Sequence, residues 1–176
     1  MTPYVLWLDG CFGAGKTTTA RLLLQRRPEL LLLDPELVGF LLWQVDPSLR
    51  ARDFRGLRLW RRLVVEHVTA VLEELGRPLV VPMSVFEDGH AGELVGELHR
   101  RDVVVHHVRL VVDEEELRRR ISAQRMSDDE ATDVGTREFR LGQLPAGLAA
   151  RTGSPLQVAG RSPDEVADAV LGMLEL

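Results

Sequence analysis

The sequence lacks the features that would place it in several large classes of protein. A single cysteine among 176 residues leaves no partner for an internal disulfide, so we expect a reducing, cytoplasmic environment. The longest apolar runs are of strand length and the N-terminus shows no basic-then-apolar pattern, so we expect neither a membrane span nor secretion. Basic residues are in the minority, 22 against 27 acidic ones for a formal net charge of -5, which argues against bulk nucleic-acid binding.

The stretch from Gly10 to Thr17, Gly-Cys-Phe-Gly-Ala-Gly-Lys-Thr, matches the phosphate-loop pattern G-x-x-x-x-G-K-[ST] without a mismatch. An apolar run leads into it and a helix-forming stretch leads out, which is the context the motif needs. The glycines allow successive amides to point inward as an anion nest at a helix N-terminus. We therefore expect ATP binding, with Lys16 on the β- and γ-phosphates and Thr17 on a magnesium ion; the alternative is an incidental glycine-rich turn. The residues predicted to bind the nucleotide are Gly10, Phe12, Gly13, Ala14, Gly15, Lys16, Thr17 and Thr18.

Five short apolar runs alternate with helical patterns along the chain. Because such runs must be buried on both faces, they predict a five-stranded parallel sheet covered by helices on both sides, an α/β fold of the P-loop class. No second domain is evident, so residues 1–176 are expected to form a single domain. Ligands of such folds bind outside the carboxyl ends of the strands, where the phosphate loop, Asp34, Met83 and Ser84 fall.

Arginine is concentrated in two places. A helix predicted from Asp53 to Leu75 carries a basic face in its first third, which is either a solvated face or a surface that meets an anion. A second group lies on the later turns of a helix that starts at Asp113, and the polar segment at about 125–142 beyond it predicts a mobile lid or a surface helix pair. The arginines are Arg50, Arg52, Arg55, Arg58, Arg61 and Arg62 in the first group, and Arg118, Arg119, Arg120 and Arg125 in the second.

Several blocks, taken together and in order, resemble the bacterial tunicamycin resistance protein family of ATP-binding P-loop proteins. The resemblance covers about residues 4 to 125 and more distantly extends to small-molecule kinases of the nucleoside monophosphate, shikimate and chloramphenicol type. It implies strand order 2-3-1-4-5, an arginine-bearing lid, and resistance by modifying or sequestering the drug. One departure is that the third strand ends without a Walker-B aspartate. The blocks are Phe12 in the loop, Asp34-Pro35-Glu36 with Gly39-Phe40, Asp53-Phe54 before Leu59-Trp60-Arg61, Val81-Pro82-Met83-Ser84, and Val105-His106-His107.

The expected chemistry is phosphoryl transfer from ATP–Mg to a hydroxyl of a nucleotide-sugar-like small molecule; the alternative is a protein that sequesters tunicamycin in the presence of ATP without chemistry. Transfer needs charge neutralisation, from Lys16 and lid arginines, and a base or orienting carboxylate, for which Asp34 is the candidate; Asp34 also suits a plain helix N-cap. Phe40 and Trp60 would stack on a ring or pack in the core. The predicted catalytic residues are Lys16, Asp34, Arg118, Arg120 and Arg125, and the predicted substrate-binding residues are Asp34, Glu36, Phe40, Arg55, Trp60, Arg61, Met83 and Ser84.

Overall fold

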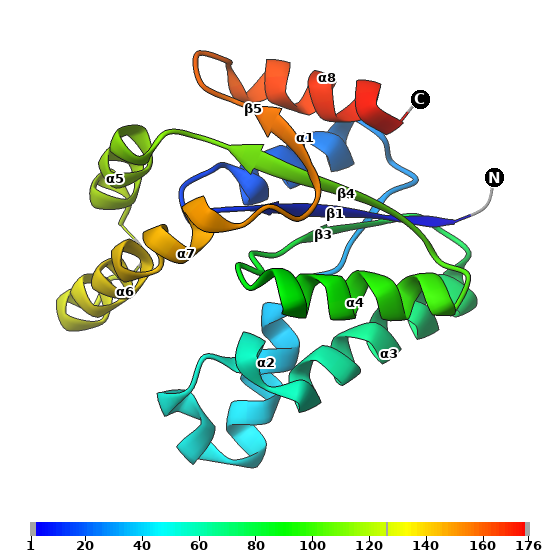
Figure 1. Ribbon diagram of the computed structural model, residues 1–176, viewed down its shortest axis with the longest axis horizontal. Helices are drawn as coiled ribbons and strands as arrows, with labels where there is room; N and C mark the ends of the chain where they lie inside the picture. Colours follow the sequence, from blue (N-terminus) through cyan, green and yellow to red (C-terminus); the bar gives the residue numbers. More distant parts are fainter. Residues whose placement is uncertain (1–2, 126, 175–176) are drawn as a thin grey trace.

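The computed structural model describes residues 3–125 and 127–174, and within them the chain forms one parallel sheet flanked by helices (Figure 1). The sheet has five strands in the order β2-β3-β1-β4-β5, as the resemblance implied, so the predicted fold class is confirmed. All four pairings are parallel, and β1 lies between β3 and β4 at the centre. The strands are β1 (Tyr4–Gly10), β2 (Leu31–Leu32), β3 (Leu79–Pro82), β4 (Val104–Val111) and β5 (Ser154–Gln157).

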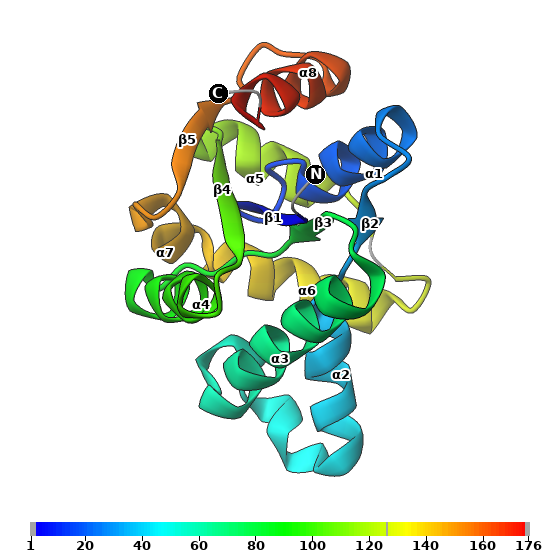
Figure 2. The same ribbon diagram turned by 90° about the vertical axis from the view of Figure 1, so that its right-hand side faces the viewer.

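Helices cover both faces of the sheet, and each face buries its own apolar core (Figures 1 and 2). Alternate residues of β1 serve opposite faces: Leu6 and Leu8 join the core under α1, α5 and α8, whereas Val5 and Trp7 join the core under α2, α3 and α4. This double burial explains why the central strands are apolar throughout. The helices are α1 (Lys16–Arg26), α2 (Glu36–Val45), α3 (Arg58–Leu75), α4 (Asp88–Arg100), α5 (Glu114–Ala123) and α8 (Pro163–Leu174). In the part of the chain described, no helix is long and apolar enough to cross a membrane.

The connection between α2 and α3 differs from the sequence prediction. The expected helix from Asp53 starts only at Arg58, and two 3-10 turns precede it, η1 (Pro47–Ala51) and η2 (Phe54–Gly56). The Asp53 side chain accepts the N–H of Arg55 at 3.0 Å, which fixes a turn instead of a helix start. Arg50, Arg52 and Arg55 therefore do not share a helix face with the arginines of α3. We call residues 36–57 the acceptor arm.

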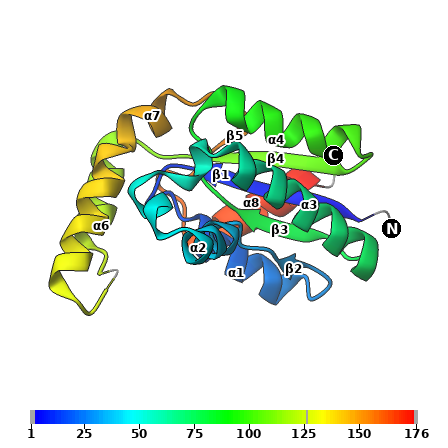
Figure 3. The same cartoon turned by 90° about the horizontal axis from the view of Figure 1, so that it is seen from below.

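The segment predicted as a lid, at about 125–142, contains α6 (Glu130–Gly142), and α7 (Leu144–Ala149) follows it. Figure 3 shows α6 standing across the end of the sheet to which the strands point. Asp129 caps α6 by accepting the N–H of Thr132 at 2.8 Å, and the Arg137–Asp133 ion pair lies one turn apart at 2.6 Å. Of the predicted segment, residue 126 lies outside the described residues, and 130–142 form an amphipathic helix; its motion stays a prediction.

Candidate nucleotide and acceptor site

The phosphate loop leaves β1 and turns directly into α1, and its glycines are required by backbone geometry at two points. Gly10 has a φ of 132°, and a Cβ there would lie 2.6 Å from the carbonyl oxygen of Leu110 on β4. Gly15, with a φ of 101°, precedes α1, and its carbonyl accepts the N–H of Thr19 at 2.9 Å. Both conformations are strained for residues with a side chain. The loop therefore presents its amides and the α1 N-terminus to one concave space, as anion binding requires.

Lys16 is the only lysine in the sequence, and its ammonium group lies within the loop. Nζ donates to the carbonyl oxygens of Gly10 at 2.8 Å and Cys11 at 3.0 Å, with no carboxylate in contact. Burial lowers the pKa of Lys16 to about 8, while the nearby charge of Asp9 acts in the opposite direction. A cation held by carbonyls alone suits an incoming anion, because phosphate oxygens are stronger acceptors.

Asp9, which the sequence analysis did not single out, fixes the start of the phosphate loop by hydrogen bonds. It is 1% exposed, and its Oδ1 accepts the N–H of Gly10 at 2.6 Å and of Val85 at 3.2 Å. His107 Nε2 on β4 lies 3.2 Å from the other carboxylate oxygen. Ser84 Oγ donates to the Gly10 carbonyl at 2.8 Å. These hydrogen bonds therefore connect the start of the loop to the segment after β3 and to β4. In the sequence, the feature that could have indicated Asp9 is a carboxylate at the end of an otherwise apolar strand.

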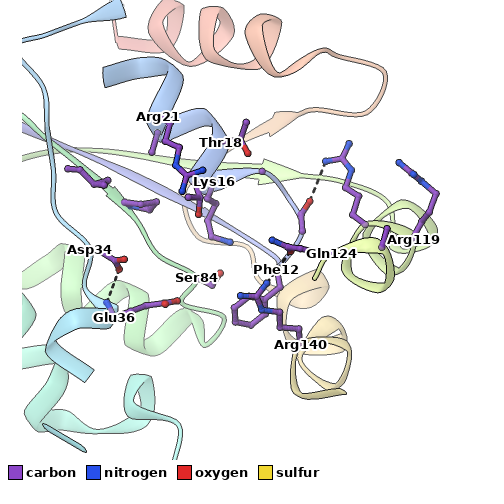
Figure 4. Close-up of a pocket in the computed structure, with 18 residues that line it drawn as sticks. Phe12, Lys16, Thr18, Arg21, Asp34, Glu36, Ser84, Arg119, Gln124 and Arg140 are labelled. Atoms are coloured by element: carbon purple, nitrogen blue, oxygen red, sulfur yellow. Dashed lines mark hydrogen bonds between the residues drawn. The ribbon is translucent and has the colours of Figure 1, made fainter. Parts of the chain in front are cut away.

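The loop opens into a cavity of about 600 Å³, the nucleotide cavity, which Figure 4 shows. Thr17 and Thr18 are exposed at the start of α1, and the Asp34 carboxylate lines the same cavity from the end of β2. A hydroxyl and a carboxylate facing one space are the oxygen donors that Mg²⁺ prefers, so this pair fits the metal. A smaller cavity of about 220 Å³ adjoins the loop near Arg120 and Arg161. The described residues lining the nucleotide cavity include Phe12, Gly13, Gly15, Lys16, Thr17, Thr18, Asp34, Glu36, Ser84, Arg119, Arg120, Gln124 and Arg140.

Two carboxylates lie between the end of β2 and the start of α2. Asp34 Oδ1 accepts the N–H of Glu36 at 3.0 Å, so the predicted capping contact is present while the Asp34 carboxylate also lines the nucleotide cavity. Burial raises the pKa of Glu36, and the neighbouring charge of Asp34 adds to that shift. In Figure 4 the Glu36 side chain extends in the direction of Ser84 and Phe12. Glu36 is thus a half-buried acid between the nucleotide cavity and the space next to it.

The structure separates the predicted lid arginines. Arg120 lines the nucleotide cavity, held by Glu116 at 2.7 Å and donating to the Gly13 carbonyl at 3.3 Å. Arg118 instead pairs with Glu114 at 2.6 Å on the exposed side of α5, and Arg125 donates to the Ser127 carbonyl at 3.2 Å away from the loop. These two placements do not favour a role in phosphate binding.

Arg140 of α6 reaches the cavity, although the sequence analysis did not single it out. Its guanidinium carbon lies 5.2 Å from the centroid of the Phe12 ring, and burial lowers its pKa while the charge of Glu36 acts against that shift. The cation therefore lies at the loop, near the half-buried Glu36. Only the long-range position of α6, which no local pattern reveals, brings it there.

A second cavity of about 620 Å³, the acceptor cavity, lies between the acceptor arm and α6. From α6 come Thr132, Gly135, Thr136, Phe139 and Arg140, which are spaced as one helix face. From the arm and the segment after β3 come Glu36, Phe40, Trp43, Arg50, Arg52, Asp53, Phe54, Arg55, Met83 and Ser84. The nucleotide and acceptor cavities share Phe12, Glu36, Ser84 and Arg140, so they border each other at the phosphate loop.

Arg55 joins the walls of the acceptor cavity. It is 7% exposed and pairs with Asp53, while its Nη2 donates to Gln143 Oε1 at 3.0 Å, next to the end of α6. Its guanidinium carbon lies 4.9 Å from the Phe86 ring centroid. Most of its hydrogen-bond donors are therefore engaged within the protein, and Arg55 connects the arm to the end of α6.

Two predicted substrate-binding residues lie outside both cavities. Trp60 is fully buried, and its Nε1 donates to the carbonyl of Pro35 at 3.0 Å. Arg61 is buried too, donating to the Arg55 carbonyl at 2.9 Å and to Glu93 at 2.8 Å. Both residues hold the acceptor arm from behind, because packing and main-chain contacts take up their polar groups.

Comparisons with known proteins agree with this geometry. A family model described as an AAA domain matches residues 5–143. The tunicamycin resistance protein of Deinococcus radiodurans is 28% identical with a TM-score of 0.76, covering 99% of this chain and 96% of that one. A sugar kinase from Janibacter sp. is 18% identical with a TM-score of 0.68, covering 98% of this chain and 95% of that one. The APS kinase of Mycobacterium tuberculosis, solved with AMPPNP and APS, is 18% identical with a TM-score of 0.65, covering 99% of each chain. No curated protein sequence gives a significant match. The predicted resemblance to the tunicamycin resistance protein family is thus confirmed, and its kinase-like neighbours share the fold.

Proposed function

The chain belongs to the AAA domain family, and we propose that it binds ATP at the phosphate loop and transfers the γ-phosphoryl group to a hydroxyl of a small molecule held in the acceptor cavity. The observation that carries the proposal is the shared wall: a phosphate loop on one side and a cavity with several aromatic residues on the other meet at Phe12, Glu36, Ser84 and Arg140. Phosphoryl transfer requires donor and acceptor in line at close range, and two cavities that share a wall suit that requirement.

On the nucleotide side, the loop amides and Lys16 would hold the phosphates. The smaller cavity beside Arg120 and Arg161 would bind the adenine ring of ATP. Thr17 and Asp34 would hold Mg²⁺, which supplies charge neutralisation at the phosphates when it is bound. Arg120 and Arg140 would meet the charge on the transferring group, because both guanidinium groups line the nucleotide cavity.

On the acceptor side, the hydroxyl oxygen would attack the γ-phosphorus, the bond from that phosphorus to the β,γ-bridging oxygen would break, and ADP would leave. The hydroxyl proton would pass to a carboxylate. We assign that role to Glu36 in preference to Asp34, because Glu36 lines both cavities and Asp34 lines only the nucleotide cavity. The raised pKa of Glu36 strengthens its carboxylate as a proton acceptor.

The proposal is tested by incubating the purified protein with ATP, Mg²⁺ and tunicamycin, and then measuring the mass of the drug by mass spectrometry. Tunicamycin is chosen because the Deinococcus relative is a tunicamycin resistance protein. A gain of one phosphoryl group with ADP in equal amount supports transfer. The matched control is Lys16→Ala, which should leave the drug unmodified. Drug that is retained only in the presence of ATP, and that keeps its mass, would instead support sequestration.

A further inference from the structure

The acceptor cavity has an unusual amount of exposed aromatic surface for a protein with few aromatic residues. Phe40 of α2 is 41% exposed and Phe139 of α6 is 46% exposed, although both line the same cavity. Trp43 and Phe54 complete that wall, with ring centroids 5.5 Å apart. Exposed rings brought to one cavity from separate segments are typical of a site that buries an apolar or aromatic body.

The same cavity carries unpaired positive charge. Arg50 and Arg52 are exposed on its arm side, and within residues 3–125 and 127–174 neither side chain has a hydrogen-bond or ion-pair partner. Elsewhere on the surface, Arg101 and Arg118 are paired with glutamates. Arg58 and Arg62 of α3, by contrast, have no side-chain hydrogen-bond or ion-pair partner among the described residues, so they match the pair in the cavity as a control.

The charge balance of the lining is opposite in sign to that of the chain. Four arginines, Arg50, Arg52, Arg55 and Arg140, stand against the two carboxylates Glu36 and Asp53, in a chain whose formal net charge is -5. Asp53 is already paired with Arg55. A local cationic site on an acidic protein attracts an anion.

We propose that the ligand of this cavity is an anionic amphiphile: a small molecule with an apolar or aromatic body that packs between Phe40 and Phe139, and a phosphate or carboxylate group that pairs with Arg50 and Arg52. Calling this ligand the phosphoryl acceptor rests on the proposed function, whereas its binding does not. Arginine forks bind such groups bidentately, which gives geometric selection as well as attraction. The cavity volume of about 620 Å³ lies within the range of pockets that bind small molecules.

The proposal is tested with two fluorescent probes that differ by one anionic group, 1-anilino-8-naphthalenesulfonate and the neutral N-phenyl-1-naphthylamine. Titrations without nucleotide should show the sulfonate bound about tenfold more tightly, as charge-assisted hydrogen bonds predict. The double variant Arg50→Gln/Arg52→Gln should bring the two affinities together. Arg58→Gln/Arg62→Gln, which removes the same charge from α3 outside the cavity, should leave both unchanged. Phe139→Ala should weaken both probes, which places them in the cavity.

Equal affinities for the two probes in the unmodified protein, or an equal loss in the α3 variant, would overturn the proposal. ATP affinity measured on the same samples keeps the outcomes distinct. Unchanged ATP binding with no preference for the anionic probe would reject the anionic ligand and leave the proposed function standing. A clear preference in a protein that binds no ATP would do the reverse.

Discussion

The two halves of the site are built in different ways. The phosphate loop is held by hydrogen bonds from buried polar groups: Asp9 is 1% exposed and Ser84 3% exposed, and both bond to Gly10. A hydrogen bond of Arg55 joins the acceptor arm to the end of α6, but rings that face the acceptor cavity contact one another edge-on and leave Phe40 and Phe139 partly open to solvent. Buried polar networks fix one geometry, whereas apolar contacts tolerate repacking. The difference suits a rigid half for a constant ligand, the triphosphate, and an adaptable half for a variable one.

The largest effect is expected on the rate of phosphoryl transfer, from a substitution at the shared wall that leaves ATP binding intact. Glu36→Gln removes the assigned base but keeps its size, so phosphoryl transfer should fall by roughly two to four orders of magnitude while ATP affinity changes little. Coupled-enzyme rates and calorimetry on the same preparation give both numbers. Asp34→Asn is the matched control, with a smaller loss in rate that added Mg²⁺ partly restores. A large loss in Asp34→Asn with an active Glu36→Gln would exchange the two roles.

The next effect concerns the nucleotide half alone. Lys16→Ala removes the only lysine and the ammonium group from the loop, so ATP affinity should fall about 100-fold, the upper range for charge-assisted hydrogen bonds. Binding of the naphthalene probes should not change, because Lys16 does not line the acceptor cavity. Circular dichroism should confirm that the fold is kept. Equal ATP affinity in the variant would remove the assignment of the loop.

The lowered pKa of Lys16, about 8, predicts a pH dependence confined to the nucleotide half. Phosphates favour the protonated ammonium and raise its pKa in the complex, so ATP binding should take up protons near pH 8. Affinity should decline as pH rises above 8, by up to about tenfold per pH unit. Calorimetry in buffers of different ionisation enthalpy measures the uptake. An ATP affinity that stays constant from pH 7 to 9.5 would contradict this assignment of the pKa.

A smaller effect is expected for the acceptor half from Gly39→Ala. A Cβ at Gly39 would lie 2.5 Å from the Phe54 ring, so the ring must move and the arm must repack. We expect the free energy of unfolding to fall by about 1–3 kcal/mol and probe affinity to drop, with ATP affinity preserved. Chemical denaturation and the two titrations measure these quantities. Gly92→Ala on α4, where a Cβ meets no atom within 4 Å, is the control.

The smallest effect tests the predicted lid. Amides of α6 should gain protection from hydrogen exchange when AMPPNP and Mg²⁺ bind, because Arg140 of that helix lines the nucleotide cavity. Amides of α4, which lies on a face of the sheet away from the loop, should not respond. Equal protection of α6 in both states would show that it is a fixed wall.

The difference between the halves also explains how far the sequence could be interpreted. The phosphate loop and the strand order follow from local motifs and apolar runs together with the family resemblance, and the structure agrees with both. Arg140 and Arg120 meet at the loop only through the placement of α5 and α6, and Arg118, two residues from Arg120, points away. The turns that replace the start of the predicted helix depend on side-chain bonds from Asp53. Such choices depend on tertiary contacts, which periodicity does not encode.

The central claim is that the nucleotide and acceptor cavities form one site across a shared wall. A crystal structure with AMPPNP and Mg²⁺ tests it most directly. We predict that Lys16 Nζ leaves the carbonyls of Gly10 and Cys11 for the phosphates, and that the γ-phosphate lies at the wall formed by Phe12, Glu36, Ser84 and Arg140, facing the acceptor cavity. A nucleotide bound with Lys16 still on those carbonyls, or with its γ-phosphate directed away from Glu36, would contradict it.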